Sequence, residues 1–91
     1  MAYSKEAKAK VISAIERLTG EHLDRYIQDS IIKVANKAME EKDSAIQVAD
    51  AVYDYMYEKV QDNIVIATAC QQCIPKNVTI LLRHEIINAL K

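Results

Sequence analysis

Apolar residues recur along most of the chain at spacings of three and four positions, with polar residues between them. This spacing is typical of amphipathic helices that bury one face. We predict four helices, over about residues 4–19, 22–41, 44–74 and 77–90. Gly20, the polar cluster "EEKDS" and Pro75 interrupt the pattern and separate them. The fold class predicted is therefore an all-α, four-helix bundle-like domain with one long central helix, about 44–74.

Several residues are candidates for the ends of these helices. Ser4 precedes the first helix, and Asp43 or Ser44 precedes the third; such side chains accept hydrogen bonds from the first free backbone N–H groups. For the fourth helix we expect Asn77 or Thr79 in that role. Gly20 is expected to end the first helix in a left-handed conformation. The apolar stripe expected on the fourth helix is Val78, Leu81, Leu82, Ile86, Ala89 and Leu90.

The third helix carries the longest regular pattern. Apolar and small residues alternate at spacings of three and four over four heptad steps, at Ile46, Ala49, Tyr53, Met56, Val60, Asn63, Ala67, Cys70 and Ile74. Such a series favours coiled-coil-like packing, with these residues toward the core. At ~1.5 Å per residue, a helix of ~30 residues is roughly 45 Å long. None of the other predicted helices covers that length alone. Either the second and fourth helices pack end to end along it, or a second copy covers the rest; we favour the second copy and therefore expect a dimer.

The candidate interface residues are taken from this helix. Its second half has little polar surface, and Ile64, Val65 and Ile66 stand there in succession. Asn63 lies within the apolar series, where a single polar residue fixes register or oligomeric state; a boundary position is the alternative. Tyr53 and Tyr57 share one helix face and Tyr55 lies on the other, so at least one ring faces solvent or a partner. We include Tyr55 and Tyr57 in the predicted interface because tyrosine is enriched at interface hot spots.

Composition adds limits to this picture. The 91 residues fit one domain, spanning 1–91, with 51% apolar residues, one Gly, one Pro and neither Trp nor Phe. So few turn-forming residues disfavour a β-rich fold. The formal net charge of -1 gives no general attraction to nucleic acid, so a nucleic-acid partner is not expected. No apolar run is long enough to cross a membrane, and no secretory signal is recognisable, so we expect a cytoplasmic protein.

The pair Cys70-Gln71-Gln72-Cys73 is the sharpest candidate for chemistry. A redox pair requires an activated thiolate, yet these cysteines fall at a predicted helix C-terminus, where the dipole opposes negative charge. A zinc site requires four ligands, and His84 is the nearest histidine that could join the two thiols. The third interpretation, which we favour, is that Cys70 and Cys73 are small buried apolar residues. No metal or other cofactor is predicted.

Residues 76–91 also suggest an alternative architecture. Thr79 and Ile80, then Glu85 and Ile86, then Ala89 and Leu90 resemble the end of a histone fold, where a long central helix, a short loop with a Thr-Ile-like pair and a final short helix follow one another. The resemblance implies a histone-like helical dimer that associates with DNA. The chain departs from it in the spacing between Ile80 and Glu85 and in its lack of a basic surface.

The motifs of common enzyme classes do not occur in the chain. It has no glycine-rich phosphate loop, no G-x-S-x-G and no H-E-x-x-H. We therefore expect no catalysis, and instead a small protein-interaction or regulatory module that acts as a homodimer, with a further protein partner possible. The alternatives are a thiol-based metal or redox site at Cys70 and Cys73, and the histone-like dimer.

Overall fold

The computed structural model describes residues 3–59 and 74–91, and this part of the chain is almost entirely helical. It contains α1 (Lys5–Thr19), α2 (Arg25–Glu41), α3 (Ala45–Lys59) and α5 (Lys76–Leu90), and no strand lies within these ranges. The prediction of an all-α helical bundle is confirmed. None of the described helices is both long and apolar enough to span a membrane.

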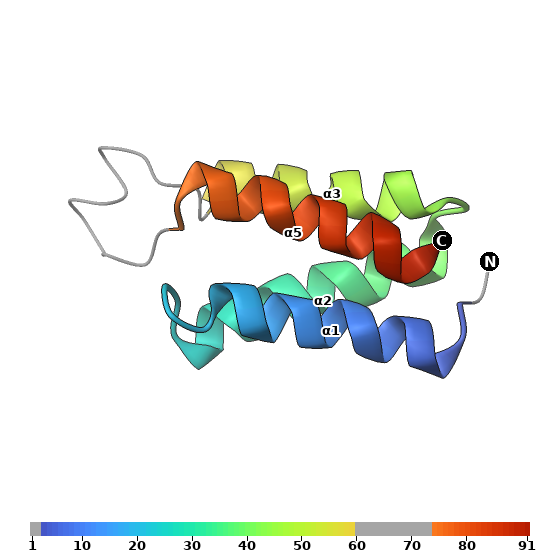
Figure 1. Cartoon of the computed structure of the whole chain (residues 1–91), viewed down its shortest axis with the longest axis horizontal. Coiled ribbons are helices and arrows are strands. Elements are labelled where there is room, and N and C mark those ends of the chain that lie inside the picture. The colour runs from blue at the N-terminus through green and yellow to red at the C-terminus, as the bar shows by residue number, and fades with distance from the viewer. Residues whose placement is uncertain (1–2, 60–73) are drawn as a thin grey trace.

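The four described helices form a closed ring of neighbours. Helix α1 packs against α2 and α5, and α3 packs against the same two helices from the opposite corner. Successive helices run in opposite directions, so the N- and C-termini of the chain lie at one end of the bundle (Figure 1). The C-terminal end of α3 and the start of α5 lie at the other end. The short connections between α1 and α2 and between α2 and α3 account for the antiparallel order of these three helices.

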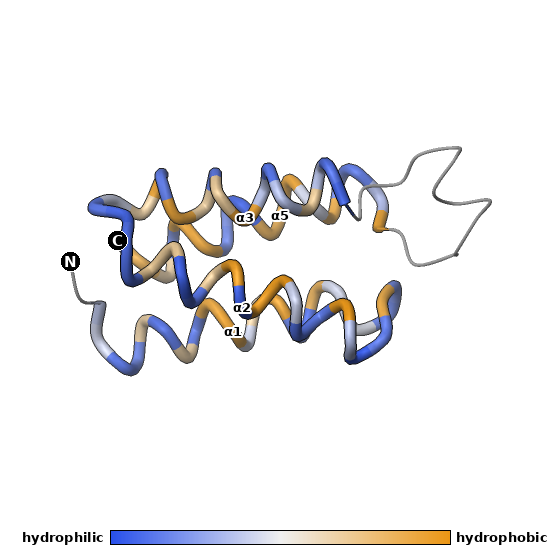
Figure 2. Tube along the Cα trace, turned by 180° about the vertical axis from the view of Figure 1, so that it is seen from behind, coloured by the Kyte–Doolittle hydropathy of each residue, from blue (hydrophilic) through white to orange (hydrophobic). Residues whose placement is uncertain are grey.

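The core is aliphatic, as expected for a chain without Phe or Trp. Hydrophobic positions recur along each helix (Figure 2), and the buried ones form a single cluster. Tyr3 and Tyr55 pack against its edge, but no aromatic ring belongs to it. The buried hydrophobic residues are Val11, Ala14, Ile15, Leu23, Ile31, Ala35, Ala38, Met39, Val48, Ala49, Val52, Met56, Ile74, Leu82, Ile86 and Leu90.

Three of the helices begin at side-chain caps. The Ser4 hydroxyl accepts a hydrogen bond from the Ala7 N–H at 3.1 Å, and the Ser44 hydroxyl accepts one from Gln47 at 3.2 Å. The Asp24 carboxylate accepts from the Ile27 N–H at 3.0 Å. The caps predicted at Ser4 and at 43–44 are thus confirmed, with Ser44 in the second role. Each satisfies a backbone donor that the helix itself leaves free.

We expect Asp24→Ala to lower the free energy of unfolding by about 1 kcal/mol, because it removes the acceptor for the first turn of α2. Asp24→Asn keeps an acceptor oxygen and should retain most of the stability. Urea unfolding followed by far-ultraviolet circular dichroism measures both. Equal stability of the alanine and asparagine variants would show that the cap contributes nothing.

Two predicted helix starts and one predicted backbone conformation differ from the structure. The second helix begins at Arg25 rather than at His22, because the chain still turns after Thr19 and Asp24 supplies the cap. Helix α1 ends at Thr19 with Gly20 as its C-cap, as predicted, but Gly20 is right-handed, with φ -63°, rather than left-handed. Helix α5 has Pro75 at its N-cap and no side-chain cap there; Asn77 and Thr79 are inside the helix. Proline fits this end since its missing N–H would have no helical partner.

Two predicted apolar stripes are also shifted. The buried residues of α3 are Val48, Ala49, Val52 and Met56, whereas Ile46 of the heptad series is 55% exposed. The heptad line runs along the edge of the buried stripe because α3 faces both α2 and α5, not one partner helix. On α5, Leu81 was expected in the core but is 46% exposed, while Leu82 beside it is buried.

The predicted long third helix cannot be compared with the structure along its whole length. Its first half is α3, and residues 60–73 lie outside the described residues. The described helices have 15, 17, 15 and 15 residues and match one another in length. The length mismatch from which a dimer was inferred therefore does not arise within the described part, and the dimer stays a prediction.

Candidate interaction surface

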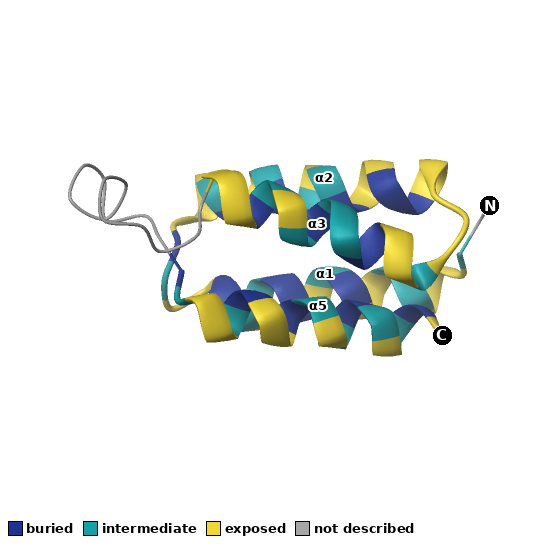
Figure 3. Ribbon diagram, turned by 90° about the horizontal axis from the view of Figure 1, so that it is seen from above, coloured by how far each residue is buried: buried dark blue, intermediate teal, exposed yellow. Residues whose placement is uncertain are grey.

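The outer side of the α3 and α5 layer combines exposed apolar side chains with a central ion pair. Figure 3 looks onto this layer, which lies nearer the viewer than α1 and α2. Ile46 and Tyr57 of α3 are 55% and 53% exposed, and Ile80 of α5 is 39% exposed. We call this surface the α3/α5 face and define it as Ile46, Asp50, Tyr53 and Tyr57 of α3 with Ile80, Arg83, His84 and Ile87 of α5.

Helical geometry accounts for this grouping. On α3 the members of the face follow spacings of four, three and four residues, which keeps side chains on one side of a helix. On α5, Ile80, Arg83, His84 and Ile87 are related by three, four or seven residues, apart from the adjacent pair 83 and 84, and so lie on one side of the helix, with the buried residues Leu82 and Ile86 on another. Each helix thus presents one stripe to the core and a second stripe to the outside. A helical bundle needs only the core-facing stripe to fold. The outward stripe therefore points to an interaction with another molecule.

An ion pair joins the two helices in the middle of the face. The Arg83 Nε–H donates to Asp50 Oδ1 at 2.7 Å, and the side chains are 30% and 48% exposed. An exposed pair of this kind adds about 0–1 kcal/mol to stability. Its clearer effect is on register, because it places the middle of α3 opposite the middle of α5.

The tyrosines of α3 divide between the face and the core. Tyr53 and Tyr57 stack, with ring centroids 6.0 Å apart and an interplanar angle of 26°. Tyr57 is the more exposed ring, whereas Tyr55 packs against the hydrophobic core. Of the two tyrosines predicted at an interface, Tyr57 thus belongs to the α3/α5 face and Tyr55 does not.

The other predicted site residues are not brought together by the described structure. Asn63, Ile64, Val65 and Ile66 lie outside the described residues, and so do both cysteines, Cys70 and Cys73. His84, the histidine considered as a third metal ligand, is exposed on α5. Within residues 3–59 and 74–91, no group of three His, Cys, Asp or Glu side chains is placed to hold a metal ion.

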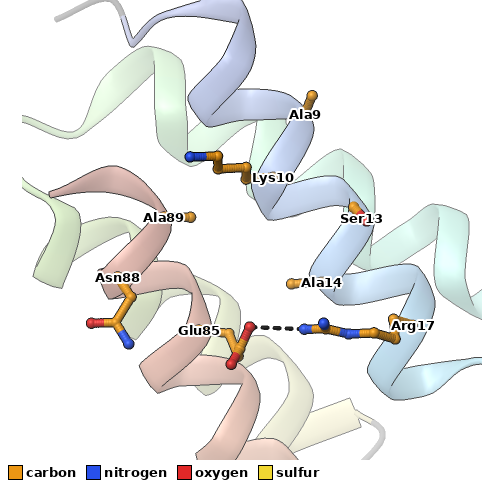
Figure 4. A pocket seen from close by; sticks show the side chains of 8 residues that line it. All are labelled: Ala9, Lys10, Ser13, Ala14, Arg17, Glu85, Asn88 and Ala89. Atoms are coloured by element: carbon orange, nitrogen blue, oxygen red, sulfur yellow. Dashed lines mark hydrogen bonds and ion pairs between the residues drawn. The ribbon is translucent and has the colours of Figure 1, made fainter.

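A furrow runs between α1 and α5 on a different side of the bundle. Its volume is about 550 Å³, and small side chains form its floor (Figure 4). Arg17 and Glu85 point toward each other across it, with Nη2 and Oε1 2.8 Å apart. These two charges neutralise each other, and the lining contains no pairing of a nucleophile with a base. The lining residues are Ala9, Lys10, Ser13, Ala14, Arg17, Glu85, Asn88 and Ala89.

The corner between α1 and α2 holds a second group of charges with a structural role. Arg25 Nη1 lies 2.7 Å from Glu16 Oε2, and its Nε lies 2.9 Å from Asp29 Oδ1. The hydrogen bond to Glu16 and the charge of Asp29 raise the pKa of Arg25 above its ordinary value. The guanidinium ties the start of α2 to the end of α1.

Sequence reasoning missed most of the α3/α5 face. Ile46 was assigned to the core, and Ile80, Arg83 and Ile87 were not considered as surface residues of interest. The signal was present in α5, where apolar residues occupy 78, 80–82, 86, 87, 89 and 90. That is more apolar surface than a single core-facing stripe requires.

Comparison with known proteins identifies no relative: no protein-family model, no curated protein and no solved structure matches the chain. The resemblance of residues 76–91 to the end of a histone fold is also at odds with the geometry. Thr79 and Ile80 lie within α5, one to two turns into the helix, and not in a loop that precedes it.

Proposed function

We propose that this chain is a non-enzymatic protein-interaction module that forms a homodimer through its α3/α5 face. The observation that carries the proposal is the position of the exposed hydrophobic side chains. Five large hydrophobic residues are exposed in the described part of the chain, and three of them, Ile46, Tyr57 and Ile80, belong to this one face. Grouped apolar side chains on a helix layer favour association, whereas scattered ones do not.

The arrangement of the face suits a protein partner better than a small ligand. Two parallel ridges of side chains, from α3 and α5, can interlock with the ridges of another helix pair. The face includes two tyrosine rings and an arginine, and these residue types are enriched at the centres of protein interfaces. The furrow between α1 and α5 offers no such surface, because small side chains form its floor and the paired charges of Arg17 and Glu85 cross it.

We expect Ile80→Glu to weaken self-association about tenfold or more, because it places an unpaired carboxylate in an apolar contact. The matched control is Leu81→Glu. Leu81 is the next residue of the same helix and is similarly exposed, but it points about 100° away from Ile80 and lies off the face. Sedimentation equilibrium over a range of concentrations measures both dissociation constants. If the two variants dissociate equally, or if Leu81→Glu dissociates more readily, the dimer uses a different surface.

A further inference from the structure

The charge pattern of the α3/α5 face also indicates the symmetry of the proposed homodimer. We propose that the second copy docks on the α3/α5 face about a two-fold axis parallel to the helices, so that Asp50 of each copy meets Arg83 of the other. This inference rests on the proposed self-association. It also identifies what makes the pairing specific, because the charges at positions 50 and 83 then determine which chains can form a dimer with one another.

The Asp50–Arg83 bond fixes which residues lie opposite one another within a single copy. Since α3 and α5 are antiparallel, one turn before Asp50 corresponds to one turn after Arg83, and this places Ile46 across from Ile87. One turn in the other direction places Tyr53 across from Ile80. One turn further, Tyr57 is across from Lys76. The face therefore carries apolar pairs on both sides of a central charge pair.

Two face-to-face arrangements with two-fold symmetry are compatible with such a layer. An axis in the plane of the face but perpendicular to the helices stacks each α3 on the other α3. Through the centre of the face, this axis brings Asp50 to Asp50 and Arg83 to Arg83. An axis parallel to the helices stacks each α3 on the other α5, and brings Asp50 to Arg83 twice. Like charges opposed at an interface cost several kcal/mol, so charge complementarity selects the parallel axis.

The same axis also matches the apolar side chains. Because the register between copies repeats the register within each copy, Ile46 meets Ile87 of the other copy, and Tyr53 meets Ile80. The Tyr57 ring meets the Lys76 side chain, where an ammonium group over an aromatic face is attractive.

The charge pair itself has capacity for a second partner. The guanidinium of Arg83 has five N–H donors in a planar fork, and the bond to Asp50 of its own chain uses the one on Nε. A carboxylate from the other copy can bind the terminal nitrogens in the bidentate geometry that arginine favours. The Arg83 side chain is only 30% exposed because it already lies against Asp50. Pairing with a second carboxylate therefore costs little additional side-chain entropy.

A charge-swapped variant tests this symmetry. Asp50→Arg combined with Arg83→Asp keeps the ion pair within each chain and, with the parallel axis, restores both pairs between two variant copies. A mixed dimer of variant and wild type would oppose like charges at both sites. We therefore expect the variant to dimerise as the wild type does, but to form mixed dimers at roughly one tenth or less of the statistical proportion. Native mass spectrometry with ¹⁵N-labelled wild type distinguishes the species.

The control is the equivalent swap of the ion pair between α1 and α5, Arg17→Glu with Glu85→Arg. That pair has a similar length of 2.8 Å but lies off the α3/α5 face, so this variant should mix freely with wild type. Statistical mixing by the Asp50/Arg83 variant, or a preference for mixed dimers as the perpendicular axis requires, overturns the proposed symmetry while self-association stands. If the wild type stays monomeric and the face instead binds a different protein, both the proposed homodimer and this inference are wrong.

Disulfide trapping provides a second measurement if the swapped variant does not fold. In a background with Cys70→Ser and Cys73→Ser, one chain carries Ile46→Cys and another carries Ile87→Cys. We expect an oxidised equimolar mixture to give mainly the mixed disulfide, because the parallel axis brings these two positions together. If the mixed disulfide is no more abundant than the disulfide between two Ile46→Cys chains, the parallel axis is wrong.

Discussion

Leu82→Ala is expected to lower the free energy of unfolding by about 2–5 kcal/mol. Leu82 is 1% exposed and belongs to the continuous core cluster, in which α5 packs between α1 and α3. Truncation removes buried methyl and methylene groups and leaves a cavity that the three helices cannot fully close. Small domains have a total stability of about 5–15 kcal/mol, so the loss would remove a large share of it.

The neighbouring leucine supplies the control for this prediction. Leu81 is in the same helix and has the same side chain, but it is 46% exposed. Leu81→Ala should change the stability by no more than about 0.5 kcal/mol. Both residues lie outside the α3/α5 face, so the comparison does not depend on self-association. Urea unfolding at a fixed protein concentration measures the difference, and similar losses for the two variants would show that the core is misplaced on α5.

Ala35→Leu is expected to destabilise the protein by about 1–3 kcal/mol, for the opposite physical reason. Ala35 is fully buried on α2 and faces a core that is already filled by larger aliphatic side chains. Three extra carbon atoms there force a change of rotamers or a separation of α2 from α3. Alanine and leucine have similar helix propensities, so the helix itself is not the source of the effect.

Ala9→Leu serves as the matched variant because Ala9 is exposed on α1, at the edge of the furrow between α1 and α5. It should leave the melting temperature almost unchanged, whereas Ala35→Leu should lower it by roughly 5–20 °C for a domain of this size. Thermal unfolding followed by circular dichroism compares the two. An equal effect of both substitutions would mean that the tight packing around Ala35 is not important for stability.

The sequence was sufficient to predict the helices because their signals are local. Caps at Ser4 and Ser44 are recognisable from single residues, and the apolar spacing places α1 and α5 nearly to the residue. The start of α2 was missed because His22 and Leu23 extend the apolar and polar pattern without being helical. Leu23 lies in the turn before α2, but its side chain is buried in the core. In the sequence it therefore looks like a core-facing position of a helix, although it is not helical.

The candidate surface was harder to predict, because it depends on which helices become neighbours. The heptad pattern of α3 predicts that Ile46, Ala49, Tyr53 and Met56 face the core. In the bundle α3 packs against both α2 and α5. Its buried stripe is therefore centred on Val52, and Ile46 is exposed. Periodicity gives the spacing of the apolar positions but not the direction that the rest of the fold assigns to them. The pairing of Asp50 with Arg83, 33 residues away, has no local signal either.

The most direct test of the central claim is an NMR dilution series of the wild-type chain. As the concentration falls and copies of the 10.3 kDa chain separate, amide signals of residues on the α3/α5 face, such as Ile46, Tyr57 and Ile80, should shift together along one dissociation curve. Signals from the outer sides of α1 and α2 should stay in place. Shifts confined to α1 and α2, or no shift at any residue across the series, would contradict the assignment of this face as the dimer surface.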